Sequence, residues 1–327
     1  MIGTRTPLRI SFFGGGTDFP EVYREIGGAV FSTTINRYIY IFLNKKTETQ
    51  GITAKYSKLE NVVDSQEITH PIIRELLTAF RIENVDISVS ADVPAGTGMG
   101  SSSSFTVGLI NACASYLSIS MSALQMSEMA CNLEMVKLGE SIGKQDAYAG
   151  GMGGLNLYEF STSGKVRVSS ANLDLKSVQI LQNSIRLISI GSPRNAASIL
   201  KKQVEEVNAD RRVLRIYEEM KSQAIWASEL KSLDLIEFGG EVDRAWSLKK
   251  EVNSSVSNNE VELLYKEGKK AGAAGGKLLG AGKSGYIMFI VPPSKLENFE
   301  LRMNKYKPRP VQLDNAGTTL ILKDLEK

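Results

Sequence analysis

The residues best suited to chemistry in this chain lie in one turn rich in glycine and serine, residues 94–104. Gly96, Gly98 and Gly100 occupy every second position, so the backbone there can adopt positive φ and approach a ligand closely. Unpaired N–H groups and the positive end of a following helix would then face the turn, which favours an anion. We therefore predict that this turn holds phosphate groups.

The sequence on either side favours a ligand-binding turn over a flexible linker. Residues 85–91 alternate apolar and polar side chains, as a half-buried strand does, and residues 105–117 are apolar enough for a buried helix. Linkers of glycine and serine are seldom framed by a strand and an apolar helix.

The scarcity of histidine limits which side chains can act as acids, bases or metal ligands. His70 is the single histidine, which excludes multi-histidine metal sites and any Ser-His-Asp triad that does not use it. Because His70 precedes Pro71 at a predicted helix start, a capping or surface role is expected for it. Acid, base and metal-binding work must fall mainly on carboxylates, hydroxyls, lysine and arginine.

Composition describes an ordinary globular protein. The chain has 327 residues, 42% hydrophobic and 23% charged residues and a formal net charge of +3, and its basic residues are spread out, so no nucleic-acid partner is expected. Its length predicts two domains. Two cysteines, Cys113 and Cys131, are expected to be buried and reduced. The sequence has neither the apolar core of a signal peptide near its start nor an apolar run long enough to span a membrane, so we expect a cytoplasmic protein without a membrane partner.

The predicted elements give an α+β fold in two parts. In residues 1–182 we expect strands at 7–13, 29–35, 38–43, 85–91, 155–160 and 166–169 and helices at 20–25, 71–80, 105–117 and from Ser122 toward Gly139. Ser122 and Gln125 have the spacing of a capping box. In residues 183–327 we expect helices at 196–207, 212–231, 233–252, 260–271 and 294–305 and strands at 186–190, 286–291 and 318–322.

A second glycine-rich stretch, residues 277–285, imitates two nucleotide motifs. It contains G-x-G-x-x-G, but it precedes a strand, whereas a dinucleotide fingerprint follows one. It also ends like a Walker A motif, but Lys277 stands where the first glycine is needed. We predict a glycine turn between a helix and a strand that closes on a nucleotide from the side opposite residues 94–104; a purely structural tight turn is the alternative.

Three stretches in this order, residues 7–18, 94–104 and 277–285, resemble the three motifs of the GHMP kinases, which include galactokinase, homoserine kinase, mevalonate kinase and phosphomevalonate kinase. The departures are small: Met99 replaces a leucine, and Ser103 and Ser104 replace alanines. The resemblance implies an N-terminal domain like the second domain of ribosomal protein S5, a ferredoxin-like C-terminal domain, and ATP with Mg²⁺ between them.

The resemblance also implies roles for individual residues. Asp146 would orient or deprotonate the attacking hydroxyl, and Glu134, twelve residues earlier as in galactokinases, would bind Mg²⁺ together with Ser102. Arg9 would steady negative charge beside the nucleophile. In isolation Asp146 would be assigned as a helix cap and Glu134 as a solvated carboxylate. The residues implied for ATP are Pro94, Gly96, Gly98, Gly100, Ser101, Ser102 and Ser103.

The acceptor motif resembles most closely that of the D-glycero-D-manno-heptose 7-phosphate kinases, which phosphorylate the C1 hydroxyl. Galactokinases have Gly-Glu-His-Thr-Asp where this chain has Gly-Gly-Gly-Thr-Asp, which argues against galactose. The substrate-binding residues implied or predicted are Gly15, Gly16, Thr17, Asp18, Arg194, Gly280 and Gly282. Among these, Arg194, near a predicted helix start, is predicted to hold the phosphate that does not react.

Two other functions stay open. One is another anomeric kinase of the family, such as a fucose kinase, although the Gly-Gly-Trp-Ser-Asp motif is missing. The other is a kinase-like sugar sensor without turnover, although Arg9, Glu134 and Asp146 are all present. The expected partners are ATP and a sugar phosphate, and a homodimer is compatible with the sequence.

Overall fold

Two long antiparallel strands, β1 (Ile2–Phe13) and β2 (Gly28–Lys45), form the centre of the computed structural model, which describes residues 1–191 and 211–324. Both strands are longer than predicted, and β2 is one strand where the sequence predicted two. A register shift between Pro7 and Leu8 accommodates Asn36 and Arg37, so the pairing continues past the polar break that had suggested a turn.

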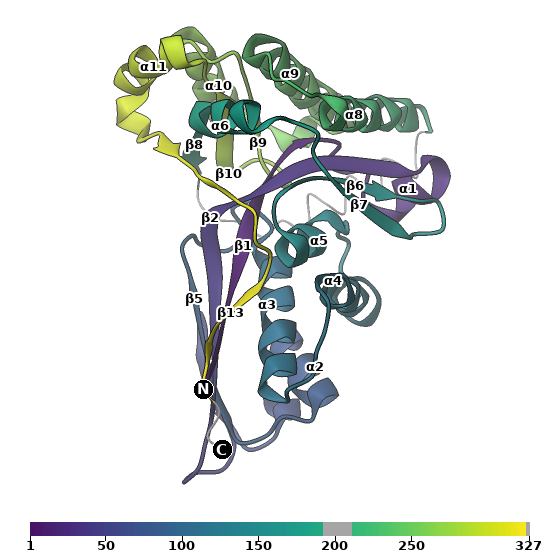
Figure 1. The fold of residues 1–327 in the computed structure, drawn as a ribbon, viewed down its shortest axis with the longest axis vertical. Helices are drawn as coiled ribbons and strands as arrows, with labels where there is room; N and C mark the ends of the chain where they lie inside the picture. Colours follow the sequence, from purple (N-terminus) through teal and green to yellow (C-terminus); the bar gives the residue numbers. More distant parts are fainter. Residues whose placement is uncertain (192–210, 325–327) are drawn as a thin grey trace.

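The first sheet surrounds these two strands (Figure 1). Its main path runs β13-β1-β2-β5-β3-β4, and β6, β7 and β12 branch from β2. The predicted strands at 85–91, 155–160 and 166–169 are confirmed, and the last two pair as a hairpin, whereas β3 and β4 were not predicted. The remaining strands of this sheet are β3 (Ile52–Lys55), β4 (Leu59–Val62), β5 (Val85–Ala91), β6 (Leu155–Phe160), β7 (Val166–Ser170), β12 (Leu313–Asp314) and β13 (Thr319–Lys323).

Helices cover one face of this sheet. α3 (Ser101–Tyr116) packs on β1 and β2. Gly108 lets the helix approach Thr6, because a Cβ there would lie 2.6 Å from the Thr6 hydroxyl. Around α3 lie α2 (Pro71–Phe80), α4 (Ala123–Cys131) and α5 (Gln145–Met152), as Figure 1 shows. The Ser122–Gln125 capping box is confirmed, and Cys113 and Cys131 are buried free thiols, as predicted.

One helix differs from its prediction. After Cys131 the chain does not continue as an α-helix toward Gly139 but forms a π-helical segment, Asn132–Lys137, in which the Leu138 N–H bonds to the Leu133 carbonyl. Single π-turns often occur at functional sites. This segment contains Glu134.

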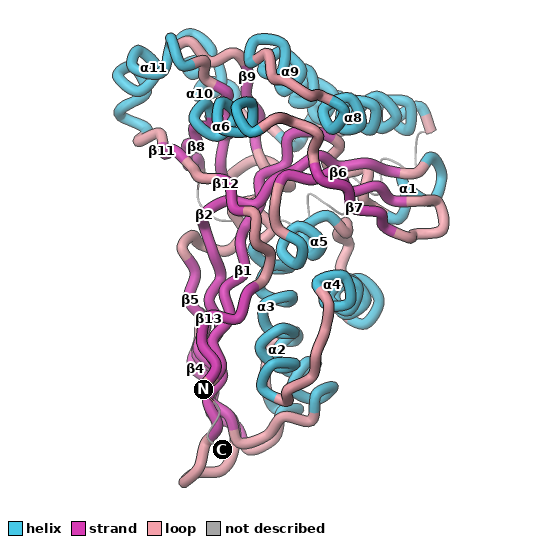
Figure 2. The backbone as a smooth tube through the Cα atoms, viewed as in Figure 1, coloured by secondary structure: helices cyan, strands magenta, loops and turns pink. Residues whose placement is uncertain are grey.

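The second sheet has the order β11-β8-β10-β9 and carries its own helices (Figure 2). Its strands are β8 (Ile185–Ile190), β9 (Gly275–Leu278), β10 (Gly285–Ile290) and β11 (Arg309–Pro310). The later helices are α6 (Leu175–Ser184), α8 (Arg212–Glu229), α9 (Leu235–Val252), α10 (Asn259–Ala271) and α11 (Leu296–Met303). Of these, α6, α9 and α10 pack on the second sheet, whereas α8 packs on β2 of the first sheet, with α1 (Pro20–Ile26) beside it. α6 was not predicted, and the predicted helix at 196–207 lies outside the described residues.

The second glycine turn is positioned differently from its prediction. Residues 279–284 join β9 to β10 in an antiparallel hairpin, so the turn lies between two strands rather than between a helix and a strand. β9 was not predicted because it begins with Gly275 and Gly276, and glycine is a poor strand former. Gly275 is needed there because a Cβ would collide with the backbone of Gly239 in α9.

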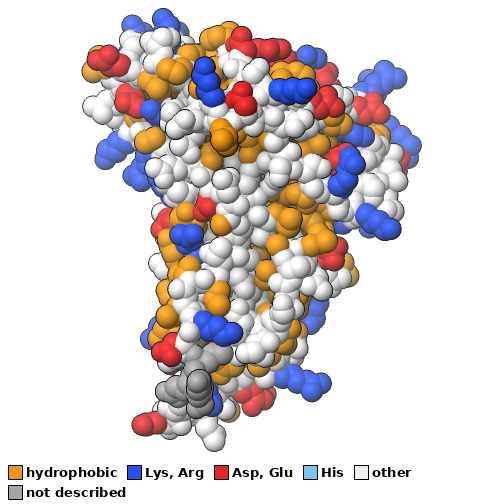
Figure 3. All heavy atoms as spheres, in the orientation of Figure 1, with side chains coloured by type: hydrophobic (Ala, Val, Ile, Leu, Met, Phe, Trp, Pro, Cys, Tyr) orange, Lys and Arg blue, Asp and Glu red, His pale blue; other side chains and the backbone are white. Residues whose placement is uncertain are grey.

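The two sheets do not divide the chain at one point. The second sheet is built from residues after 183, but β12 and β13 return to pair with β2 and β1. The division into residues 1–182 and 183–327 stays a prediction. None of the helices in the described ranges is long and apolar enough to cross a membrane. On the face drawn in Figure 3, basic and acidic side chains are interspersed.

Neighbouring glycines in α9 predict opposite effects on stability. Gly240 is exposed, and a Cβ added there meets nothing within 4 Å, so Gly240→Ala is expected to raise the free energy of unfolding by roughly 0.5–1 kcal/mol. At Gly239 a Cβ would lie 2.5 Å from the Ala274 Cβ, so Gly239→Ala is expected to lower it. Thermal unfolding of the two variants checks this; equal shifts would contradict the packing of α9 on β9.

Candidate active site

A cleft of about 360 Å³ lies where the first glycine turn, the acceptor motif and the second glycine turn meet. Most of the predicted site residues line it. From the predicted set, the structure places Arg9, Gly15, Gly16, Asp18, Gly96, Gly98, Gly100, Ser101, Ser102, Ser103, Glu134, Asp146 and Gly280 on its walls.

The first glycine turn has the backbone that was predicted for a phosphate cradle. Gly96, Gly98 and Gly100 have φ of +75°, +78° and +77°, a region that side chains disfavour. Gly100 is the N-cap of the 16-residue α3, so the unpaired N–H groups of its first turn open toward the cleft. Pro94 lies outside this cleft and lines a smaller cavity of about 250 Å³ with Tyr286 and Arg309.

Glu134 has the features of a buried metal ligand. Its side chain is 2% exposed, Oε1 accepts a hydrogen bond of 2.8 Å from the Thr106 hydroxyl, and Oε2 has no partner among the described residues. Burial raises the pKa of Glu134 to about 7, against the hydrogen bond from Thr106 that lowers it. An orphaned buried carboxylate oxygen of this kind needs a proton or a cation.

The surroundings of Glu134 fit Mg²⁺. No group of three or more His, Cys, Asp or Glu side chains in the described part of the chain could enclose a metal ion. Mg²⁺ in kinases does not need one, because it is held by one or two carboxylates, waters and the substrate phosphates. Glu134 and Ser102, an exposed residue in the first turn of α3, line the same cleft. Together they supply two of the ligands that Mg²⁺ needs.

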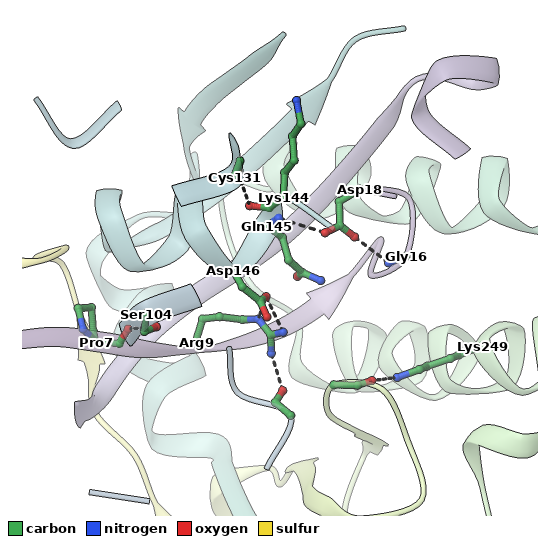
Figure 4. Close-up of polar contacts among 12 residues, drawn as sticks. Pro7, Arg9, Gly16, Asp18, Ser104, Cys131, Lys144, Gln145, Asp146 and Lys249 are labelled. Carbon is green, nitrogen blue, oxygen red and sulfur yellow. Dashed lines mark hydrogen bonds and ion pairs between the residues drawn. The ribbon is translucent and has the colours of Figure 1, made fainter. Parts of the chain in front are cut away.

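Arg9 and Asp146 form an ion pair in the cleft (Figure 4). The Nε and Nη2 atoms of Arg9 lie 2.7 and 2.6 Å from Asp146 Oδ1, and Nη1 donates to the Gly98 carbonyl at 2.6 Å. Both contacts to Asp146 use Oδ1, and Oδ2 forms no hydrogen bond or ion pair with the described residues. Arg9 therefore fixes the carboxylate in one orientation and ties it to the phosphate-binding turn.

Asp18 is held at the N-terminus of α5. It is 1% exposed, and its two oxygens accept from the backbone N–H groups of Gly16 at 3.1 Å and Gln145 at 3.0 Å. Gly143 leaves room for it, since a Cβ there would collide with the Asp18 carboxylate. Burial raises the pKa of Asp18 to about 6, and the neighbouring Asp146 adds to this.

Besides Pro94, two described residues of the predicted set, Thr17 and Gly282, do not line the cleft. Thr17 is fully buried and uses its hydroxyl within the protein, on Gly14 and Ala29. Gly282 packs against Val256, where a Cβ would lie 2.6 Å from the carbonyl oxygen. Arg194 lies outside the described residues.

Gly280, by contrast, joins the two glycine turns. Its φ is +67°, and a Cβ there would collide with the Cα of Gly98. At Gly98 a Cβ would lie 2.6 Å from the Leu279 carbonyl oxygen. The backbones of the two turns are thus in direct contact at the wall of the cleft.

Two buried lysines in the cleft were not predicted as site residues. Lys249 of α9 is 9% exposed and donates to the Gly280 carbonyl, and Lys277 of β9 is 4% exposed and donates to the Phe12 carbonyl at 2.9 Å. Figure 4 shows Lys249 reaching from its helix to the glycine turn. The sequence offered a signal for Lys277, because it is the first residue of the third motif. It offered none for Lys249, which is one of many lysines in predicted helices.

The buried state of Asp18 predicts how stability depends on pH. The pKa of Asp18 is about 6 when folded and 3.8 when unperturbed, so the folded chain binds more protons between these values and stability falls as pH rises through them. We expect the free energy of unfolding to fall by about 2 kcal/mol more in the parent than in Asp18→Asn between pH 4 and 6. Unfolding curves at several pH values measure this; parallel pH profiles would contradict it.

Comparisons with known proteins show the family of this chain. Residues 67–154 match the family model described as the GHMP kinases N terminal domain. The chain is 30% identical over 317 residues, 93% of each sequence, to a D-glycero-alpha-D-manno-heptose 7-phosphate kinase of Campylobacter jejuni. The chain belongs to the GHMP kinase family. It is accordingly an ATP-dependent phosphotransferase with an alcohol group as acceptor.

Solved structures show the same fold over the whole chain. A crystal structure of a D-glycero-D-manno-heptose 1-phosphate kinase from Bacteroides thetaiotaomicron has a TM-score of 0.77 at 23% identity and covers 100% of both chains. Phosphomevalonate kinase of Streptococcus pneumoniae, in complex with phosphomevalonate and AMPPNP, has a TM-score of 0.73 at 13% identity and covers 98% of this chain and 100% of its own. The predicted two-domain α+β fold of the GHMP kinases is confirmed.

Proposed function

We propose that this GHMP kinase is a sugar kinase that transfers the γ-phosphoryl group of ATP to the C1 hydroxyl of D-glycero-D-manno-heptose 7-phosphate, giving the 1,7-bisphosphate. The observation that carries the proposal is the Arg9–Asp146 ion pair, which stands between the acceptor turn with Asp18 and the phosphate-binding turn. The Campylobacter jejuni relative, named a heptose 7-phosphate kinase, supports this choice of acceptor.

In this proposal each residue has a defined task. Asp18 accepts hydrogen bonds from sugar hydroxyls, and Asp146 uses Oδ2 to orient the C1 hydroxyl and take its proton. Arg9 holds Asp146 by Oδ1 and adds positive charge where the phosphoryl group passes. The backbone of residues 94–104 and the first turn of α3 bind the phosphates of ATP.

Glu134 and Ser102 are the proposed ligands of Mg²⁺. When bound there, Mg²⁺ would neutralise charge on the phosphate oxygens. The pKa of Glu134, raised to about 7 by burial, means that the carboxyl group must release a proton as the cation binds. The buried Oε2 of Glu134, which has no hydrogen-bond partner among the described residues, supports a divalent cation at this position.

The test is ADP release with Mg·ATP and a panel of acceptors. The panel contains heptose 7-phosphate, heptose 1-phosphate, mannose, fucose, galactose and mevalonate, and phosphorus NMR locates the new phosphate. Heptose 1-phosphate is included because the name of the Bacteroides thetaiotaomicron structure differs in this point. Turnover of heptose 7-phosphate with a new phosphate on C1 supports the proposal. Preference for an unphosphorylated sugar would overturn it, and ATP binding without turnover of any acceptor would favour a sensor.

A further inference from the structure

The buried lysines Lys249 and Lys277 present an electrostatic problem that the proposed catalytic groups do not solve. Both line the cleft and both are at least nine-tenths buried, yet neither forms an ion pair with a carboxylate of the described residues. Burial lowers the pKa of both lysines, and the neighbouring charges that act on them are further cations: Arg9 on Lys249, and Lys249 and then Arg9 on Lys277. Buried cations without a counterion are costly to the fold.

Each lysine also has hydrogen-bonding capacity left over. An ammonium group carries three donors. Lys249 uses one on the Gly280 carbonyl and Lys277 uses one on the Phe12 carbonyl, and each contact holds the ammonium in place without neutralising it. Two fixed ammonium groups that face one cleft form a site for a group with two negative charges and several acceptor oxygens, which a phosphate monoester provides.

The position of the lysines bears on which of the two phosphorylated substrates they bind. The residues suited to the phosphates of ATP, namely the first glycine turn, Ser102 and Glu134, all lie in the first half of the chain. Lys249 and Lys277 come from α9 and β9 in the second half, and Lys277 is fixed to β1 at Phe12, directly before the turn that holds Asp18. Lys249 is fixed to Gly280, whose turn contacts the phosphate-binding turn, so the pair lies between the two substrates. The contact of Lys277 with β1 anchors the pair on the acceptor side.

We propose that Lys249 and Lys277 bind the phosphate group that the acceptor sugar already carries, an inference that rests on the proposed function. They take the place that was predicted for Arg194, which lies outside the described residues. Burial and the neighbouring cations lower the pKa of Lys249 to about 7 and lower that of Lys277 as well. A bound phosphate would reverse this effect, because its charge favours the protonated ammonium.

The experiment compares Lys249→Met and Lys277→Met with the parent. Methionine keeps the length of the apolar stem and removes the charge, so the fold should persist, and thermal unfolding of each variant checks this. Lys250→Met is the matched control, because Lys250 is the next residue of α9 and pairs with Glu262 at 3.1 Å, away from the cleft. Lys277→Arg, which keeps the charge, is the second control should Lys277→Met fail to fold.

Two measurements are made on each variant: calorimetric binding of heptose 7-phosphate without ATP, and steady-state kinetics with this acceptor and with unphosphorylated heptose. In each methionine variant we expect Kd and KM for the sugar phosphate to rise about 10²-fold. KM for ATP, kinetics with unphosphorylated heptose and all constants of Lys250→Met should stay within about twofold.

Three results would overturn the inference: unchanged sugar-phosphate binding in both methionine variants, a rise in KM for ATP alone, or a fall in kcat that is equal for both acceptors. The last would place the lysines on the transferred phosphoryl group. Failure of the proposed function looks different, because the parent itself would then not use heptose 7-phosphate. If the parent uses another sugar phosphate, the same comparison is made with that acceptor; a parent that uses only unphosphorylated sugars overturns both proposals.

Discussion

Asp146→Asn is expected to lower kcat about 10³-fold, the usual range for loss of a positioned general base. The substitution removes the proposed proton acceptor and leaves the guanidinium of Arg9 without its anionic partner, although Arg9 is only 4% exposed. Because Arg9 still bonds to the Gly98 carbonyl, ATP binding should be retained. Steady-state ADP release together with nucleotide titration measures the two effects separately.

The control for this prediction is Glu128→Gln, which removes a carboxylate from an exposed position on α4. It should leave kcat unchanged. A kcat of Asp146→Asn within about twofold of the parent would remove Asp146 from the reaction and leave it as a structural partner of Arg9.

Gly280→Ala is expected to be the most damaging single methyl addition in the cleft. The new Cβ would meet the Cα of Gly98 in the facing turn, and the backbone φ of +67° adds strain of its own, of order 1 kcal/mol or more. Because neither backbone has a side chain that can move aside, the two turns must separate. We expect kcat/KM for ATP to fall about 10²-fold, as for other small displacements of binding groups, and the thermal midpoint to fall as well.

A matched variant separates the collision from the strain. Gly164, in the turn between β6 and β7, has a φ of +81°, but a Cβ there meets only side-chain atoms of Lys144 and Tyr23, from 3.4 Å outward, which is ordinary contact. Gly164→Ala should therefore lose some stability and keep its activity. If Gly280→Ala behaves in the same way, the contact between the two glycine turns is not needed for nucleotide binding.

The parts of this fold that were predictable are those with local signals. Period-two alternation predicted β5, and Ser122 with Gln125 predicted the start of α4, because a strand face and a capping box are each written within a few neighbouring residues. The glycine spacing predicted the backbone of the first turn for the same reason.

The unpredicted parts depend on contacts between distant residues. β9 has two glycines and a buried lysine, and its extended form comes from pairing with β10 and packing on α9. The π-turn at Glu134 cannot be read from hydrophobic periodicity. Lys249 became a candidate only when the fold carried α9 to the cleft, since nothing distinguishes it in sequence from Lys250, which points to Glu262.

The return of β13 to the first sheet also has a consequence for biosynthesis. β1 pairs with β2 on one side and with β13 on the other, so its second edge has no partner until nearly the whole chain has been synthesised. An unpaired edge strand is a template for pairing between molecules. We therefore expect nascent chains to need protection at β1 for as long as the second sheet is being translated, and chains that stop before β13 to aggregate rather than fold as separate N-terminal domains.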